Sequence, residues 1–241
     1  MTMSHLNESP SPLKQTRMRS PAAKAARREV LLEAGRKLFL SQNYAEIRVQ
    51  DIVKASGLAK GTFYLYFQTK EALFLGVLLA EMQAWILDLA DALEQAVRVA
   101  PKESEKGNLM PAPLAQIVVV SLSERLLFRR LLALLHPVIE ENLDAETALA
   151  FKETLAGLLA PLSGQLENGF GDFAPGDGLR FLLALNALVI GLEQMSRPTP
   201  QMEAILAAPH LAPLKVNFES ELTFLLTRLL AGWNAGDVDN G

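Results

Sequence analysis

The sequence contains no cysteine, which excludes disulfide bonds, thiolate zinc sites and cysteine nucleophiles. It also has no apolar run of the length that crosses a membrane, which is about 20 residues. The longest run, Phe181 to Leu192, is interrupted by Asn186. Residues 1–20 carry no apolar core of the signal-peptide type. We therefore expect a cytoplasmic protein without a membrane partner.

Runs of β-branched residues are scarce, and the only sizeable one covers residues 117–120, inside a longer helical pattern. Leu, Ala and Glu, which favour helices, are abundant instead. Of the 241 residues, 50% are hydrophobic, which is ample for a buried core. The composition therefore predicts an all-α protein.

Positive charge is concentrated at the beginning of the chain. Residues 1–71 hold 12 Lys and Arg against 6 Asp and Glu, whereas the remaining residues hold 11 against 21. A basic segment joined to an acidic one indicates that the first alone binds a polyanion. A basic tail without any ligand has the same charge, so charge leaves both interpretations open.

Helical periodicity and capping signals divide the chain into three parts. Residues 1–19 predict a disordered basic arm, residues 20–67 a small helical domain, and residues 68–241 a larger helical domain. Ser20, Thr69 and Asp144 are expected to cap helices, and Pro137 to kink or end one. The predicted helices cover residues 20–40, 49–55, 59–66, 70–98, 114–135, 144–168, 177–195 and 214–233, with a short one near 201–208.

Residues 48–67 have the pattern of a helix-turn-helix. Two short helices flank Gly57, which suits a sharp turn that needs positive φ. Gly61 and Thr62 lie on one face of the second helix, where small residues let a helix approach base edges. The opposite face should pack inward with Ala59, Phe63 and Phe67. A plain helical hairpin has similar spacing, but the basic segment and the aromatic cluster favour DNA binding.

Several segments between residues 30 and 73 match one known family. They are Ala34 to Phe39, Tyr44, Val49 to Ile52, Ala55 to Leu58, Lys60 to Phe67 and Lys70 to Leu73. This stretch resembles the N-terminal domain of the tetracycline-repressor (TetR/AcrR) family. The combined match is far more specific than a general helix-turn-helix pattern. The resemblance implies a three-helix DNA-binding domain, followed by a variable helical domain for ligand binding and dimerisation.

The resemblance also implies a homodimer that binds a palindromic double-stranded DNA operator and, most commonly, represses transcription. Carried over by position, it places Lys60, Gly61 and Thr62 at bases or adjacent phosphates. It places the remaining polar residues at the DNA backbone: Tyr64, Tyr66 and Lys70.

Two positions of the candidate DNA surface depart from the family pattern. Arg48 stands where Ser or Thr usually caps the first short helix and contacts phosphate. Arg48 can still reach phosphate as a cation, but it cannot cap, so we expect a less well capped helix. Ala59 stands where a serine is common at the start of the recognition helix, which removes one phosphate contact.

The last two long predicted helices have the features of a dimer interface. The helix at 177–195 is apolar nearly all round and therefore needs cover on every side. Its small residues Ala184, Ala187 and Gly191 permit close approach of another helix. The final helix has apolar residues at the 4-3-4 spacing of a bundle seam: Phe218, Leu222, Leu225 and Leu229. These seven residues are expected at a homodimer interface, although a core within one subunit accounts equally well for one face.

A ligand pocket is expected among the helices of the larger domain. The apolar character of residues 114–195 favours a small hydrophobic or aromatic effector. Candidate pocket residues are Met82, Trp85, Phe128, His136, Phe151 and Asn186, although plain core packing explains each aromatic as well. His136 and Glu140 are four residues apart, but one such pair is too little to predict a metal ion. We expect neither a metal nor a cofactor.

Two other function classes compete with a regulator. An enzyme is not favoured, because the nucleotide-binding, metalloprotease and nucleophile-elbow motifs are all missing and the chain has 3 histidines. A helical small-molecule carrier with a vestigial DNA-binding head has Arg48 as its best support. Strongly salt-dependent DNA affinity would separate a regulator from that carrier.

Overall fold

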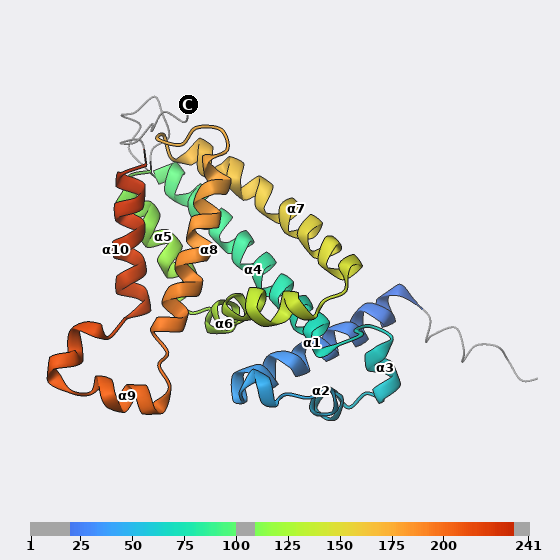
Figure 1. Cartoon of the computed structure of the whole chain (residues 1–241). Coiled ribbons are helices and arrows are strands. Elements are labelled where there is room, and N and C mark those ends of the chain that lie inside the picture. The colour runs from blue at the N-terminus through green and yellow to red at the C-terminus, as the bar shows by residue number, and fades with distance from the viewer. Residues whose placement is uncertain (1–19, 100–108, 234–241) are drawn as a thin grey trace, which may run out of the picture. The chain divides into compact units, whose positions relative to one another are not determined.

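The structure, a computed structural model, describes residues 20–99 and 109–233 (Figure 1). The predicted basic arm, residues 1–19, lies outside the described residues. Helices dominate the described part, which confirms the all-α prediction. They are α1 (Pro21–Ser41), α2 (Val49–Ser56), α3 (Lys60–Tyr64), α4 (Lys70–Val99), α5 (Pro111–Ser123), α6 (Leu126–Leu134), α7 (Ala145–Gly169), α8 (Asp177–Met195), α9 (Pro200–Leu206) and α10 (Phe218–Ala231).

The chain forms two compact units, Met1–Leu73 and Phe74–Gly241. The sequence placed this division before residue 68, whereas the structure places it inside the first turns of α4. The reason is that Lys70 and Glu71 hydrogen-bond to residues of the first unit. The beginning of α4 therefore belongs to the first unit.

The first unit is a three-helix domain whose helix ends follow the predicted signals. The Ser20 hydroxyl accepts the Ala23 N–H at 3.2 Å, and Thr69 Oγ1 accepts the Ala72 N–H at 3.1 Å. Gly57 ends α2 with a φ of 67°, the left-handed conformation that glycine adopts without penalty. The core of the unit is apolar and fully buried: Leu31, Phe39, Ile52 and Phe63.

The second unit is a helical bundle in which α8 lies between α7 and α10, and α5 packs along α10 (Figure 1). At the crossing of α7 and α8, a Cβ on Gly178 would stand 2.3 Å from the Ser163 carbonyl oxygen. Glu167 of α7 accepts the N–H groups of Gly176 and Gly178 at 2.9 and 3.1 Å. This carboxylate therefore satisfies backbone donors at the start of α8.

The prediction of one helix over residues 114–135 was wrong, because the helix is interrupted between α5 and α6. The break leaves carbonyls at the end of α5 without helical partners. The Arg129 guanidinium donates to the carbonyls of Leu122 and Ser123 at 2.6 Å each. The Ser121 and Ser123 hydroxyls donate to the carbonyls of Val118 and Val119. The Arg129 guanidinium thus supplies donors to carbonyls that a continuous helix would bond to backbone N–H groups, and the two serine hydroxyls add local bonds within α5.

Pro137 lies in a π-helical turn, Leu135–Ile139, that ends the α6 region, as predicted.

The predicted start of the last helix was wrong. Pro209–Leu214 form a 3₁₀ helix, and α10 begins at Phe218, where the Asn217 side chain accepts the Ser220 N–H at 2.9 Å. Asn217 was missed because the apolar pattern extends past it.

Two helices, α4 and α8, are long and apolar enough to cross a membrane by length and composition. The core helix of a globular protein passes the same test. Of the most apolar stretch of α4, 56% is buried inside the structure, against 39% for α8. The α4 helix therefore serves as a core helix, whereas much of α8 faces outward.

Candidate DNA interface and ligand cavity

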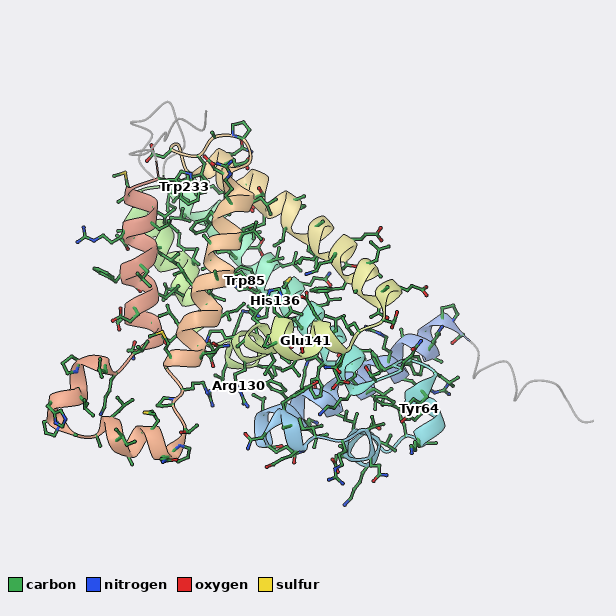
Figure 2. All side chains as sticks on the ribbon, viewed as in Figure 1. Tyr64, Trp85, Arg130, His136, Glu141 and Trp233 are labelled. Atoms are coloured by element: carbon green, nitrogen blue, oxygen red, sulfur yellow. The ribbon has the colours of Figure 1, made fainter. Side chains whose placement is uncertain are left out.

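The outer face of α3 is open to solvent, while its inner face anchors the first unit. Phe63 and Phe67 are buried, with their ring centroids 5.9 Å apart, as predicted. Lys60, Gly61 and Tyr64 are exposed, and Tyr64 is labelled on α3 in Figure 2. Apart from Gly61, its two chain neighbours and the backbone of α3, no atom of the described residues lies within 4 Å of the position that a Cβ of Gly61 would take. The helix backbone is therefore bare on this face.

The other residues predicted in or next to α3 differ in their exposure to solvent. Thr62 and Tyr66 are half-buried. Ala59 is exposed, and the prediction that it packs inward was wrong. The reason is that Ala59 precedes the first helical turn in an extended conformation, with φ −68° and ψ 147°. It therefore borders the outer face instead of joining Phe63.

The start of α2 is capped from inside the helix. Arg48 is exposed and makes no side-chain cap, as predicted from the missing Ser or Thr. The Asp51 carboxylate instead accepts the backbone N–H of Arg48 at 2.9 Å. This is one half of a capping box, and an acidic residue three positions into the helix was the available signal. Capping by Asp51 leaves the Arg48 guanidinium uncommitted to the helix end.

The prediction that Lys70 contacts the DNA backbone is not supported by its position. Its ammonium donates to the carbonyls of Tyr44 and Ile47 at 3.2 and 3.0 Å, and lies 4.3 Å from the centre of the Tyr44 ring. The Tyr44 hydroxyl in turn donates to Glu71 at 3.0 Å. Burial and the adjacent Glu71 carboxylate raise the pKa of Tyr44, which keeps the phenol a neutral donor. Lys70 and Tyr44 thus fasten α4 to the turn before α2.

Lys70→Met should therefore act on stability. We expect the free energy of unfolding of the first unit to fall by about 1–3 kcal/mol, because two carbonyls lose their charged donor. Urea titration followed by circular dichroism measures this change. An unchanged stability together with a salt slope of DNA binding reduced by about one would instead identify Lys70 as a phosphate contact.

The second unit contains a cavity of about 150 Å³ that is partly open to solvent, where His136 and Lys152 are 53% and 52% exposed. Five of the six predicted pocket residues line it: Met82, Trp85, Phe128, His136 and Asn186. The prediction for Phe151 was wrong, because its side chain is buried in the core and its neighbour Lys152 faces the cavity. The rest of the wall is aliphatic: Leu122, Leu132, Leu135, Leu155, Leu159, Leu182, Leu183, Leu185 and Val189.

The charged groups of the cavity are paired with one another. Glu140 accepts from the Lys152 ammonium at 2.5 Å and contacts His136 Nδ1 at 2.8 Å. Burial of Glu140 opposes its ionisation, but the hydrogen bonds from Lys152 and His136 hold its pKa below the ordinary value. Within residues 20–99 and 109–233, no group of three or more acidic or histidine side chains is placed to hold a metal ion.

The inner part of the cavity has two aromatic rings and one amide. The rings of Trp85 and Phe128 lie 5.4 Å apart between centroids, and the Trp85 indole N–H donates to Ser121 at 2.9 Å. Trp85 and His136 are labelled in the middle of the second unit in Figure 2. The Asn186 side chain has no hydrogen-bond partner in the described part of the chain. Its amide is therefore available to a ligand.

The predicted dimer residues separate into two groups. Ala187 is exposed, and four others are partly exposed: Ala184, Gly191, Leu225 and Leu229. The prediction was wrong for Phe218 and Leu222, which are buried inside the subunit. The inward face of α10 has steps of four residues, Phe218, Leu222, Leu226 and Leu230, so the predicted 4-3-4 seam combined two faces of the helix.

A buried ion pair between α6 and α8 was not predicted. Arg129 Nε donates to Glu193 at 2.9 Å, and the two side chains are 10% and 3% exposed. The Arg129 guanidinium also lies 4.1 Å from the centre of the Phe218 ring. A single acidic residue in the otherwise apolar second half of α8 was the only available signal. Arg129 thereby joins the end of α5 to α8 and α10.

Comparison with known proteins decides the family. The family model for the tetracyclin repressor-like C-terminal domain matches residues 79–237, and the model for bacterial regulatory proteins of the tetR family matches residues 31–77. The chain belongs to the TetR family. In this TetR-family protein, the matched residues 31–77 include the predicted helix-turn-helix at 48–67.

Individual relatives agree with this assignment over shorter stretches. The HTH-type transcriptional regulator YuxN of Bacillus subtilis is 42% identical over 50 residues, which cover 21% of this chain and 17% of YuxN. The HTH-type transcriptional regulator EthR of Mycolicibacterium smegmatis is 31% identical over 81 residues, 34% of this chain and 36% of EthR. The matches thus span well under half of either relative.

A solved structure shares the fold. The fatty acid degradation regulator FadR of Bacillus halodurans superimposes with a TM-score of 0.51 at 20% identity, over 85% of this chain and 97% of FadR. This likeness supports the two-part helical architecture of the TetR-family chain.

Proposed function

We propose that this TetR-family protein represses transcription as a homodimer that binds a palindromic operator through α3 and releases it when a small molecule occupies the cavity. The observation that carries the proposal is the outer face of α3, where Lys60 and Tyr64 flank the bare backbone at Gly61. A bare helix surface beside a cation fits the major groove, where base edges must be reached closely.

The proposed DNA contacts fall into two classes. Lys60, Gly61 and Thr62 face base edges, with Lys60 donating to guanine acceptors. Arg48, Tyr64 and Tyr66 contact phosphates, which fix the position of the protein without reading sequence. Ala59 borders this surface and contributes no polar group.

The proposed homodimer joins α8 and α10 of two subunits. Exposed apolar side chains on these helices support it, among them Phe224 at 56% exposure. Gly191 has open space where a Cβ would stand, so a helix of a partner could approach its backbone closely. The surface residues of this interface are Ala184, Ala187, Gly191, Leu225 and Leu229.

The cavity is proposed to hold a hydrophobic or aromatic effector. Because its walls come from α4 to α8, a ligand there can favour one arrangement of these helices over another. Only such a preference changes DNA affinity.

The carrier alternative is not favoured, since the fold keeps an intact DNA-binding face. We place this regulator in the cytoplasm, acting by binding and without a catalytic step.

Selection of random duplexes on the purified protein, followed by titration at two salt concentrations, tests the proposal. We expect enrichment of a palindromic duplex, and the affinity of the protein for this duplex should fall steeply with salt. Lys60→Ala should weaken binding about tenfold and relax base preference, whereas Tyr64→Ala should weaken all sequences alike. Lys37→Ala, an equal loss of charge on α1, is the control and should change affinity little. The absence of any enriched duplex would favour the carrier.

A further inference from the structure

We propose that the cavity ligand is a small uncharged molecule built on one aromatic ring and bearing a hydroxyl group, a phenol-type compound. This inference rests on the regulatory function proposed above and specifies the chemistry of its effector. Three properties of the cavity carry it: its size and aromatic wall, its one unpartnered amide, and the balanced charge at His136, Glu140 and Lys152.

The size and the wall suit a single ring. A cavity of about 150 Å³ lined by Leu, Ile and Phe side chains stays dry and binds benzene. The cavity here has about the same volume, 150 Å³, and eight of its lining residues are leucines. Trp85 and Phe128 add two neighbouring aromatic faces, against which another ring packs favourably in a tilted or offset arrangement.

The Asn186 amide supplies the polar recognition. A carboxamide offers two N–H donors and one acceptor, and none is used within the part of the chain that the structure describes. When an apolar ligand displaces water from this amide, the amide loses its hydrogen bonds at a cost in free energy that a polar group of the ligand avoids. A hydroxyl group both accepts and donates one hydrogen bond, so it can pair with the amide without bringing charge into the cavity.

The charges at His136, Glu140 and Lys152 argue against an ionic ligand. The Glu140 carboxylate already neutralises the Lys152 ammonium and holds His136 Nδ1. A ligand carboxylate would have to share Lys152 with Glu140, at the cost of like-charge repulsion. When Nδ1 donates to Glu140, the Nε2 atom of a neutral His136 ring becomes an acceptor, which a hydroxyl also satisfies.

Fluorescence of Trp85 measures binding without DNA. The full chain carrying Trp233→Phe leaves Trp85 as the single tryptophan; Trp233 packs beside Phe173 and Phe181 and does not line the cavity. The probes are 4-methylphenol, toluene, which lacks the hydroxyl, and 4-methylbenzoate, which replaces it with a carboxylate. At pH 7 the phenol is uncharged, because phenols ionise near pH 10.

We expect 4-methylphenol to bind about tenfold more tightly than toluene, and 4-methylbenzoate to bind more weakly than either. Asn186→Leu should remove the preference for the phenol and keep toluene binding, whereas Asn168→Leu, the same change on the exposed side of α7, should leave the preference intact. Equal affinity for phenol and toluene, tighter binding of the benzoate, or no binding at all overturns the proposal. If 4-methylphenol bound as expected but the ligand-free protein bound no operator duplex, only the proposed function would be overturned.

Discussion

Arg129→Met is expected to lower the free energy of unfolding by about 3–5 kcal/mol, the cost of leaving one charge of a buried pair without its partner. Glu193, which is 3% exposed, would keep a carboxylate in the core without its hydrogen-bonded partner, although Arg197 at 3.8 Å and Arg130 still interact with it electrostatically. The carbonyls of Leu122 and Ser123 would also lose their donor at the break between α5 and α6. Urea titration at one fixed protein concentration measures the loss.

A matched control exists four residues earlier in the chain. Arg125 pairs with Asp88 at the surface, where Asp88 is 66% exposed. Arg125→Met should therefore cost about 1 kcal/mol or less. Combining Arg129→Met with Glu193→Leu should recover much of the loss, since neither member of the buried pair is then left without the other. If the two arginine variants were equally stable, the buried pair would contribute nothing beyond a surface pair.

The position of this pair connects stability to the proposed regulation. Phe128 precedes Arg129 and lines the cavity, and Val189, one turn before Glu193, lines it too. Arg129 also faces Phe218 at the start of α10, one of the two helices proposed to form the dimer. A ligand that shifts α6 against α8 would therefore strain a buried ion pair whose geometry tolerates little change. This gives the cavity a physical route to α10.

Local signals in the sequence were sufficient for the helix ends of the first unit and for the buried side of α3. Ser20, Thr69 and Asp144 cap the predicted helices with their side chains, because capping depends on residues three positions apart. The positive φ of Gly57 likewise follows from its place between two short helices. Phe63 and Phe67 face inward because a period of 3.6 residues fixes their direction.

Contacts between distant residues could not be predicted in this way. Lys70 is an attractive phosphate ligand in sequence, yet its ammonium meets carbonyls 23 and 26 residues away. Arg129 and Glu193 are 64 residues apart, and only the packing of α6 on α8 brings them together. Phe218 and Leu222 fitted a dimer seam because periodicity gives a buried face without saying whether a second subunit or the same subunit covers it.

Gly61→Leu is expected to reduce operator affinity by about 100-fold, because a leucine on the outer face of α3 would hold the helix away from base edges. The same change should leave the fold intact or stabilise it by up to about 1 kcal/mol, since glycine is a poor helix former. There is room for the new side chain in the free protein, because no described atom outside α3 and the chain neighbours of Gly61 lies within 4 Å of the added Cβ.

Operator affinity and stability must be measured separately for this variant, because they are expected to change in opposite directions. Gly157→Leu, at another helical glycine with open space around it, should bring a similar gain in stability without loss of DNA binding. Gly61→Ala should fall between the wild-type protein and Gly61→Leu in operator affinity, because a methyl group displaces the helix less. Binding to random duplexes should decline less than operator binding, since phosphate contacts tolerate a small displacement. If Gly61→Leu bound the operator normally, α3 would not be the helix in the groove, and the proposed orientation of the DNA-binding domain would be wrong.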